Sequence, residues 1–509
     1  MTSPASALPD DPGTLKALLE EERAENERLR QIIKAMQRHR FGRRAESLPE
    51  DQLLLGLEEA EQVEAAGLEK AETAPAVKAE RTTRRRANRG ALPSHLPRVE
   101  TLVDVESTAC PCCSGTMHRI GEDVSERLDI VPAQVRVLVI RRPKYACRAC
   151  EDVVVQAPAP ARLIEGGLPT DSTLAQVLVS KYADHLPLYR QAQIYARQGL
   201  TLDRSTLADW VGRAAFLLRP VHQRLLDKLK ASPKLFADET TAPVLDPGRG
   251  RTKTGQLWAY ARDDRPWGGT DPPGVAYVYA PDRTAERPIA HLAGFRGVLQ
   301  GDGYEGYKVL ARRGEVQLAL CWSHVRRPFY ELASGGAAPI ATEALSRIAA
   351  LYRIEAEIRG RSAEERRSVR QARSRPLVEA MEPWLREKLN LVSQKSKLAE
   401  AIRYALTRWA GLTLFLDDGR VELDTNVVER AIRPLALNRK NALFAGSDGG
   451  AEHWAVIASL VETCKLNGVE PQAYLADVIS RIVDGHPQSR LDELLPWAYP
   501  TTPALKAVA

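Results

Sequence analysis

Three acidic residues lie where a charge would be costly without a bound cation. Asp238 is in the middle of a short apolar run, Asp302 directly follows another, and Glu429 is on an expected helix over 426–433 that also carries basic residues. Ionised carboxylates are stable in apolar surroundings only when they are paired or bound to metal. Two divalent cations held roughly 3.5–4 Å apart can activate a water or hydroxyl for attack on a phosphodiester and stabilise the leaving 3′ oxygen. Mg²⁺ (or Mn²⁺) prefers oxygen ligands, so these positions predict metal-dependent phosphoryl transfer.

Four other acids close to these positions leave the assignment open. They are Glu239, Asp246, Glu305 and Asp424. A single aspartate near the end of a strand is more often a turn or cap residue than a metal ligand. Asp424 in particular could replace Glu429 if the helix there begins later than expected. The residues alone favour the first set without excluding the others.

The elements that must position the acids suggest a ribonuclease-H-like α/β core. Strands are expected over 233–245, 256–261 and 274–280, followed by a helical stretch, a strand that ends before Asp302, and a strand over 316–321. In such a sheet, the strand ends bring acids that are distant in sequence to one edge.

A helical insertion is expected between the last of these strands and Glu429. Ser362 and Glu365 have the spacing of a capping box, which opens a helix. Apolar residues then recur at helical spacing at Leu398, Ile402, Leu406 and Trp409.

Two C-x-x-C pairs have a spacing typical of a structural zinc site. The pairs are Cys110 with Cys113 and Cys147 with Cys150. Four thiolates at tetrahedral geometry would close a Zn²⁺ site, whereas a redox motif would not need two pairs. Cys112 is a spare thiol that could replace Cys113. Residues 135–140 between the pairs alternate as in a β-strand, so we expect a zinc-binding ribbon.

Two helices joined by a tight turn are expected after the ribbon. Residues 187–199 form a helical pattern closed by a glycine, and residues 204–213 form a second one. The second helix begins with Arg204, Ser205 and Thr206, which are polar and basic as in a DNA-reading helix-turn-helix. An ordinary helical hairpin would have the same pattern.

The N-terminal region combines an expected oligomerisation segment with a charged linker. Apolar residues recur at heptad spacing through residues 15–36, and Asn26 at an a position is a residue type that fixes register in dimers. A helix packed on its own protein is the alternative. The whole chain has a net charge of +6, and one basic segment over residues 78–98, which contains Arg84, Arg85 and Arg86, has an equal excess of positive charge. Such a segment is a solvated tail or a DNA-binding arm that neutralises phosphates.

The sequence shows no secretion signal and no run of about 18 apolar residues. We therefore expect a soluble cytoplasmic protein with no membrane partner and with reduced cysteines.

The chain resembles the transposases of the insertion-sequence-66 family from the coiled-coil region almost to the C-terminus. Ordered blocks of sequence carry this resemblance. They are Arg40-Phe-Gly-Arg-Arg-Ala-Glu46, Cys110-Pro-Cys-Cys113, Lys181-Tyr-Ala-Asp-His-Leu-Pro-Leu-Tyr-Arg190, Ala237-Asp-Glu-Thr240, Asp246-Pro-Gly-Arg-Gly-Arg-Thr-Lys-Thr-Gly255, Asp302-Gly-Tyr304, Cys321-Trp-Ser-His324-Val-Arg-Arg327, Glu429-Arg-Ala-Ile-Arg-Pro434 and Arg439-Lys-Asn441.

The resemblance implies that Asp238, Asp302 and Glu429 are the family's catalytic acid triad and bind Mg²⁺ or Mn²⁺. The family's usual Asp-Asn-Asn before the glutamate is Asp424-Thr425-Asn426 here, a departure that spares the catalytic position.

Basic residues around the acids complete the expected DNA-binding set. They are Arg430, Arg433, Arg439 and Lys440, with Arg326 and Arg327 as possible accessory residues. Such cations would balance the phosphate charge that develops in the reaction. His324, in a Cys-x-x-His pair, resembles a recurring feature beside such active sites, where it could orient a phosphate or a metal-bound water. A packed cysteine and a surface histidine are the alternative.

The implied function is a DDE-type DNA transposase that binds the terminal inverted repeats of an insertion sequence, cleaves DNA and transfers strands. Pairing two ends requires at least a dimer, and small accessory proteins of the same element are possible partners, in the bacterial cytoplasm at the nucleoid. A catalytically silent DNA-binding repressor and a nuclease on the same core are the rival functions.

The expected fold is a multidomain α+β protein. Its units are an N-terminal coiled coil (1–45), an acidic then basic linker (46–98), a zinc ribbon (99–160), a helix-turn-helix region (161–230), the first part of the core (231–334), the helical insertion (335–412), the second part of the core with the glutamate (413–470) and a C-terminal helical tail (471–509).

Overall fold

The computed structural model describes residues 135–146, 154–246, 251–314, 316–334, 338–442 and 444–500. All of them belong to one unit of the chain, Val131–Leu505. The expected coiled coil, the linker with Arg84, Arg85 and Arg86, and the four cysteines predicted to bind zinc lie outside the described residues.

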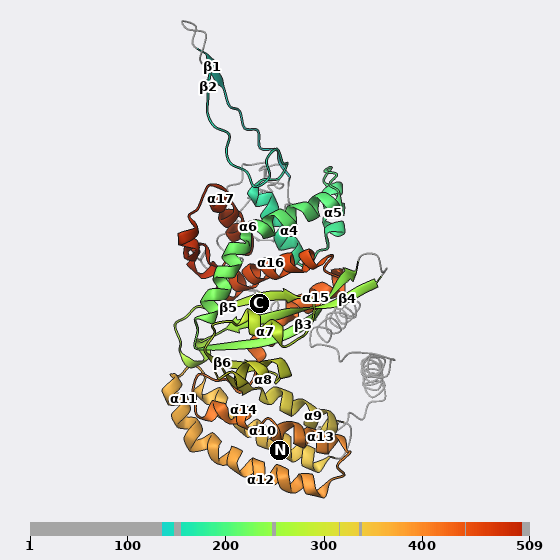
Figure 1. Cartoon of the computed structure of the whole chain (residues 1–509), viewed down its shortest axis with the longest axis vertical. Helices are drawn as coiled ribbons and strands as arrows, with labels where there is room; N and C mark the ends of the chain where they lie inside the picture. Colours follow the sequence, from blue (N-terminus) through green and yellow to red (C-terminus); the bar gives the residue numbers. More distant parts are fainter. Residues whose placement is uncertain are drawn as a thin grey trace, which may run out of the picture. The chain divides into compact units, whose positions relative to one another are not determined.

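A mixed five-stranded sheet with the order β5-β4-β3-β6-β7 is the centre of this unit (Figure 1). Its strands are β3 (Lys234–Asp246), β4 (Arg251–Arg262), β5 (Gly274–Ala280), β6 (Gly297–Gly301) and β7 (Val316–Leu320). β3, β4 and β5 pair antiparallel, whereas β6 runs parallel to β3, and β7 runs parallel to β6. The five strands expected from the sequence are confirmed, although β4 begins several residues earlier than predicted.

Gly297 allows β6 to start directly beside β3. Its φ is +138°, a conformation that other residues rarely adopt, and a Cβ there would lie 2.2 Å from the carbonyl oxygen of Pro233. The neighbouring Val298 N–H donates to that oxygen at 2.9 Å. The glycine therefore sets where the two central parallel strands begin to pair.

Three helices precede the sheet in the described residues, and others lie between its strands or follow them along the chain. They are α4 (Asp171–Tyr182), α5 (Leu188–Arg197), α6 (Arg204–Lys230), α7 (Glu286–His291), α8 (Glu305–Arg312), α9 (Trp322–Ser334), α15 (Asn426–Ala442), α16 (Asp448–Leu466) and α17 (Pro471–Val483). α15 packs against β3 and β4, α16 packs against β5 and α6, and α17 packs against α4. No helix of the described residues is long and apolar enough to cross a membrane.

Side chains from α6 and α16 satisfy the outer edge of strand β5. Thr463 Oγ1 accepts from Val275 N–H at 3.1 Å and donates to Val275 C=O at 3.0 Å, and Ser459 Oγ accepts from Tyr277 N–H at 2.8 Å. The ring of His222 lies 2.8 Å from the Tyr277 carbonyl oxygen. Buried backbone groups without partners are costly, and an uncovered edge invites pairing with another chain. The two helices thus take the place of a sixth strand.

The helix-turn-helix prediction is right in its first helix and wrong in the length of its second. α5 ends before Gly199, whose φ of +81° closes the helix as expected. α6 does not stop at residue 213 but continues to Lys230, through Pro220. Its buried residues keep helical spacing beyond the predicted end, as Leu218 and Leu225 show, because this half of the helix packs beside the sheet.

The predicted strand over residues 135–140 is wrong. These residues have no regular structure and are exposed, Val137 by 86%. The described strands of this region are instead β1 (Lys144–Ala146) and β2 (Val154–Gln156), which pair antiparallel. Alternation of residue types favours a strand only where a partner strand supplies hydrogen bonds. Among the described residues of this region, β2 pairs with β1 and does not extend along residues 135–140.

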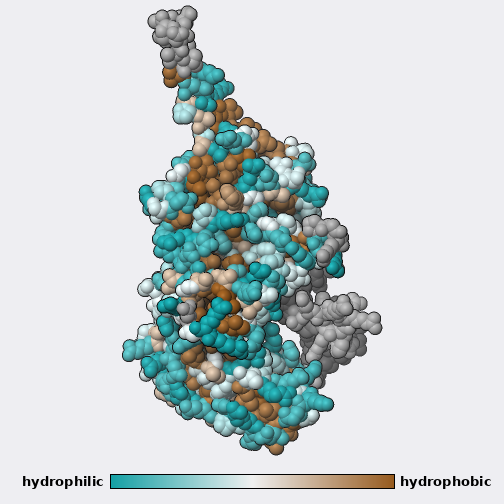
Figure 2. Space-filling view, viewed as in Figure 1, coloured by the Kyte–Doolittle hydropathy of each residue, from teal (hydrophilic) through white to brown (hydrophobic). Residues whose placement is uncertain are grey.

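The helical insertion predicted between β7 and Glu429 is confirmed as a set of helices, whose apolar side chains pack together with residues of β6, β7 and α9. They are α10 (Pro339–Ile358), α11 (Ala363–Val369), α12 (Arg375–Leu391), α13 (Lys397–Leu406) and α14 (Trp409–Thr413), with one π-helical turn at Arg370–Ser374. The capping box of Ser362 and Glu365 is present, and Ile402 is fully buried. The visible face of these helices is largely hydrophilic with scattered hydrophobic residues (Figure 2), because the apolar side chains gather inside.

A buried network of charged residues connects the insertion to the segment that leads to Glu429. Arg366 and Arg370, which are at most 1% exposed, both bind Glu355, with shortest distances of 3.2 and 2.6 Å. Arg366 also binds Glu422 at 2.7 Å, and the backbone of Glu422 in turn bonds the Gln300 side chain of β6. Buried charges need such pairing, so this network fixes the approach of the chain to the third acid.

Replacing Glu355 with glutamine should destabilise this unit strongly. Two buried arginines would lose their shared carboxylate, and breaking a buried ion pair by removing one partner costs about 3–5 kcal/mol. Urea denaturation followed by circular dichroism measures the change in the free energy of unfolding. The matched control is Glu382→Gln, because Glu382 pairs with Arg386 on the surface of α12, and an exposed pair contributes about 0–1 kcal/mol. Equal destabilisation by both variants would contradict this role.

Candidate active site

Parallel pairing of β3 with β6 places two of the predicted acids side by side. Phe236 is opposite Gln300 in the register of the two strands. Asp238 and Asp302 each lie two residues beyond this pair, one within β3 and the other directly after β6. Because parallel neighbours advance together, equal offsets bring the two carboxylates to the same level of the sheet.

The third acid, Glu429, reaches the same region from a helix. It is in the first turn of α15, which packs against β3 and β4. Glu429 is close enough to Asp238 for its charge to raise the pKa of the Asp238 carboxyl. The three acids that the sequence singled out are therefore electrostatic neighbours, although 127 positions separate Asp302 from Glu429 (429 − 302).

Burial and like charges together raise the pKa of Asp238 to about 8. Burial is the largest cause, followed by the negative charges of Glu239 and Asp302, with a smaller effect from Glu429. One hydrogen bond, from the Glu239 N–H to Asp238 Oδ1 at 2.8 Å, opposes them. A cluster of carboxylates that repel one another is stabilised by a divalent cation, and oxygen ligands of this kind suit Mg²⁺. The donor set of the cluster thus fits such an ion.

The loop that carries Asp302 is held on both sides. The Tyr304 N–H donates to Asp302 Oδ1 at 2.9 Å, and Gly303 between them has a φ of +92°. Tyr404 of the helical insertion donates its hydroxyl to the Asp302 carbonyl oxygen at 3.2 Å, and the Arg408 guanidinium lies 3.8 Å from the Tyr404 ring centroid. The insertion therefore borders the acid cluster, a contact that the sequence pattern could not reveal.

Each alternative acid has a partner that explains it without a metal. Glu239 accepts from Arg283 Nε at 2.8 Å and from the Tyr307 hydroxyl at 3.0 Å. Asp424 accepts from the Asn426 N–H and side chain, as a residue that opens α15. The two others are Glu305, which is exposed and paired with Lys308, and Asp246, which ends β3 opposite Arg251. The geometry favours the original set over these four.

Glu429 is held by a residue that the sequence reasoning overlooked. Thr425, four positions earlier, donates its hydroxyl to Glu429 Oε1 at 2.9 Å and is 2% exposed. Its position was noted only as a departure from the family's usual asparagine. The spacing of four residues was the available signal, since residues i and i+4 face each other along a helix.

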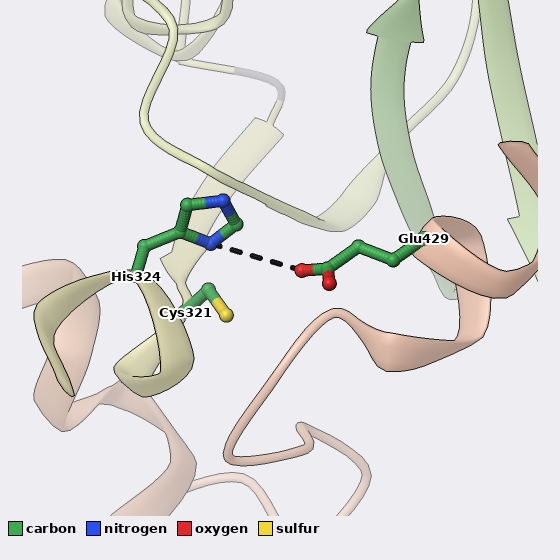
Figure 3. A group of neighbouring side chains, drawn as sticks. All are labelled: Cys321, His324 and Glu429. Atoms are coloured by element: carbon green, nitrogen blue, oxygen red, sulfur yellow. Dashed lines mark ion pairs between the residues drawn. The ribbon is translucent and has the colours of Figure 1, made fainter. Parts of the chain in front are cut away.

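His324 and Cys321 lie beside Glu429 (Figure 3). His324 Nδ1 is 3.8 Å from Glu429 Oε1, and Cys321 is buried at the junction of β7 and α9. The structure therefore brings the predicted accessory histidine to the acid cluster. Arg326 and Arg327 follow on α9 and are exposed.

The basic residues predicted to bind DNA line the helix that carries Glu429. Arg430, Arg433 and Lys440 are exposed on α15, and Arg439 is half-buried and donates to the Thr241 carbonyl oxygen of β3 at 2.6 Å. On α6, which begins elsewhere in the unit, Arg204 and Ser205 are exposed and Thr206 is half-buried. Basic side chains therefore lie along the same helix as Glu429.

Comparisons with known families cover most of the chain. Residues 166–453 match the family described as "Transposase IS66 family", and residues 459–497 match the "IS66 C-terminal element". Residues 107–151 match the "zinc-finger binding domain of transposase IS66", and residues 28–101 match "Transposase C of IS166 homeodomain". The resemblance found in the sequence is thereby confirmed.

Related proteins from Sinorhizobium fredii align over most of their length and are described as uncharacterized. Protein y4jD is 51% identical over 417 residues, which is 81% of this chain and 82% of the relative. Protein y4qI is 45% identical over 543 residues, covering 98% of this chain and 99% of the relative. Protein y4hP is 40% identical over 491 residues, covering 92% and 88%.

The zinc-finger and homeodomain matches imply zinc and DNA binding, and the transposase match implies a divalent metal at the catalytic centre. These implications agree with the acid cluster and the basic helix beside it. By sequence, and over most of its length, the chain belongs to the IS66 family of transposases.

Proposed function

We propose that this protein is a DDE-type transposase in which Asp238, Asp302 and Glu429 hold the catalytic divalent cations. The observation that carries the proposal is the Asp238 carboxyl, whose pKa is raised first by burial and then by the charges of Glu239, Asp302 and Glu429. Such mutual repulsion is costly for the fold and is useful only when a cation offsets it. Mg²⁺ or Mn²⁺ would activate the attacking water or 3′ hydroxyl and stabilise the leaving oxygen.

We propose further that the sheet is a ribonuclease-H-like core. Three antiparallel strands followed by two parallel ones, in the order β5-β4-β3-β6-β7, support this assignment. So do the positions of the acids, one on the central strand, one after its parallel neighbour and one on a later helix. The long helical insertion before that helix would be an elaboration of the same core.

The chain's own residues would orient both the acids and the DNA. The Thr425 hydroxyl holds one oxygen of Glu429, and the Tyr404 hydroxyl holds the backbone at Asp302. Exposed Arg430 and Arg433 on α15 would bind phosphates of the DNA end and reduce their negative charge next to the acids. Hydrolysis at the end of the element would release a 3′ hydroxyl, which then attacks a phosphodiester of the target.

The remaining predicted residues would recognise DNA and assemble the complex. Four thiolates, Cys110, Cys113, Cys147 and Cys150, would hold a structural Zn²⁺. The Arg84–Arg86 segment and the start of α6 at Arg204 would contact phosphates and bases of the terminal inverted repeats. The coiled coil over residues 1–45 would pair two copies, one for each DNA end, with accessory proteins of the element as further partners.

Removing either a strand acid or the helix acid should abolish DNA cleavage. We expect Asp238→Asn and Glu429→Gln each to lower the rate by at least about 100-fold, because the cations lose a charged ligand. The assay incubates purified protein and Mg²⁺ with a labelled fragment that carries the element's own end and a second DNA as target, with and without the accessory proteins.

Glu305→Gln is the control for this experiment, because Glu305 is an exposed acid three residues after Asp302 that pairs with Lys308. It should cleave like the wild type, and all variants should retain DNA binding in a gel-shift assay. If wild type and Asp238→Asn cleave equally, or if the wild type binds the end and never cleaves it, the proposed function is wrong.

The Thr425 hydroxyl should matter for metal use as well as for rate. In Thr425→Val the Glu429 carboxylate loses its hydrogen bond, and loss of such a partner of a metal ligand typically costs 10–100-fold in metal affinity or activity. We expect the Mg²⁺ concentration for half-maximal cleavage to rise by about tenfold or more. Thr425→Ser, which keeps the hydroxyl, should behave like the wild type. A rate loss in Thr425→Val with unchanged Mg²⁺ dependence would argue against this role.

A further inference from the structure

A second group of ligand atoms adjoins the acid triad and shares Glu429 with it. The Cys321 sulfur, a ring nitrogen of His324 and a carboxylate oxygen of Glu429 all lie within 4.8 Å of one another (Figure 3). Cys321 and His324 come from the start of α9, and Glu429 comes from α15. Two separate elements therefore present soft and hard ligand atoms to one point.

His324 Nδ1 is a buried polar atom without a hydrogen bond in the described residues. Its nearest carboxylate oxygen, Glu429 Oε1, is 3.8 Å away, beyond the roughly 2.7–3.2 Å of a hydrogen bond. A buried nitrogen of this kind is unfavourable unless something lies between it and the carboxylate.

The Cys321 sulfur is surrounded by hydrogen-bond donors. The backbone N–H groups of His324 and Thr425 both donate to it, and the Thr425 side chain contacts it as well. Burial is the largest influence on this thiol and raises its pKa to about 11, and the hydrogen bonds oppose that shift because they favour a sulfur that carries negative charge. Groups that ligate metals are typically oriented by such bonds. The bond from His324 is the one that an N-cap residue makes, since Cys321 directly precedes α9 and His324 lies in its first turn. Together the two backbone bonds hold the sulfur in place beside His324 and Glu429.

The spacing and the types of these atoms fit one class of ion. A tetrahedral cation with ligand bonds of about 2.0–2.3 Å separates neighbouring ligand atoms by roughly 3.3–3.8 Å. The His324–Glu429 separation of 3.8 Å is at this limit. All three ligand atoms lie within 4.8 Å of one another, so small side-chain shifts would bring the remaining separations into this range. Thiolate and imidazole favour Zn²⁺ and Co²⁺, whereas Mg²⁺ takes oxygen ligands.

We infer that Cys321, His324 and Glu429 form a binding site for a divalent cation of the Zn²⁺ and Co²⁺ class, separate from the magnesium-binding acid triad. Both contacts of Glu429 described above use Oε1, and the charge of the same carboxylate acts on Asp238. The Glu429 carboxylate would thus bridge two kinds of site, and the cation at Cys321 and His324 would fix its orientation. This inference rests on the proposed function only through the shared Glu429.

Metal content and cobalt spectroscopy of the full-length protein test the inference without DNA. Purified protein is stripped of metal, titrated with Co²⁺ and measured for bound metal and for sulfur-to-cobalt charge-transfer absorption. With Mg²⁺ in excess to occupy the acid triad, the wild type should bind roughly two equivalents of Co²⁺, one at the four ribbon cysteines and one here. Cys321→Ser and His324→Ala should each bind roughly one equivalent, and Cys321→Ser should lose part of the charge-transfer absorption.

Cys464→Ser is the matched control, because Cys464 is the other buried cysteine of the described residues and lies on α16 away from these ligands. It should bind as much cobalt as the wild type. Circular dichroism and a urea midpoint report whether each variant folds. If Cys321→Ser does not fold, His324→Ala decides, since the His324 side chain is 24% exposed and its removal disturbs the core less.

Equal cobalt binding by the wild type, Cys321→Ser and His324→Ala would overturn the inference. The outcome is independent of catalysis. If both variants lose cobalt while Asp238→Asn still cleaves DNA, the proposed function fails and this site stands. If Asp238→Asn is inactive while cobalt binding is unchanged in both variants, the proposed function stands and this site fails.

Discussion

The parallel pairing of β3 with β6 is the constraint on which the rest of the site depends. It sets two carboxylates at the same level of the sheet, with Asp238 buried and Asp302 held on a glycine turn. Because Asp238 is buried, water screens the repulsion between these carboxylates only weakly. Opposite charges in the protein or in a bound ion must therefore reduce it. Opposite charge comes from Arg283, which pairs with Glu239 and also interacts with the charge of Asp302. What remains is a concentration of negative charge of the kind that divalent cations bind.

The helical insertion helps to position the third acid. Its buried arginines bind Glu355 and reach Glu422, and the backbone at Glu422 is bonded to Gln300 of β6. The segment that leads to Glu429 is therefore connected to the strand that ends at Asp302. Buried charge pairs tolerate little displacement, so they fix the position of Glu429 relative to the sheet although it is distant in sequence from the strands. Tyr404 adds a direct contact from the insertion to the Asp302 backbone.

The surroundings of Glu429 show how a departure from the family pattern can be absorbed. Thr425 is where the family usually has asparagine, and its hydroxyl bonds the Glu429 carboxylate. The same residue contacts the Cys321 sulfur, so one side chain links the acid to the cysteine and histidine beside it. Threonine is compact enough to be buried between these groups while still donating a hydrogen bond.

The family, the five strands, the helical insertion and its capping box could all be predicted from the sequence, because periodicity and ordered motifs are local properties. The same local reasoning failed for residues 135–140 and for the end of α6, where pairing and packing with distant residues decide the structure. The roles of the acids and of the paired cysteines remain predictions. The fold was needed to see which acids lie together, that Glu239 and Asp424 have other partners, and that Thr425, Cys321 and His324 meet at Glu429. These contacts join residues from separate elements, and their energies depend on distances that no sequence pattern contains.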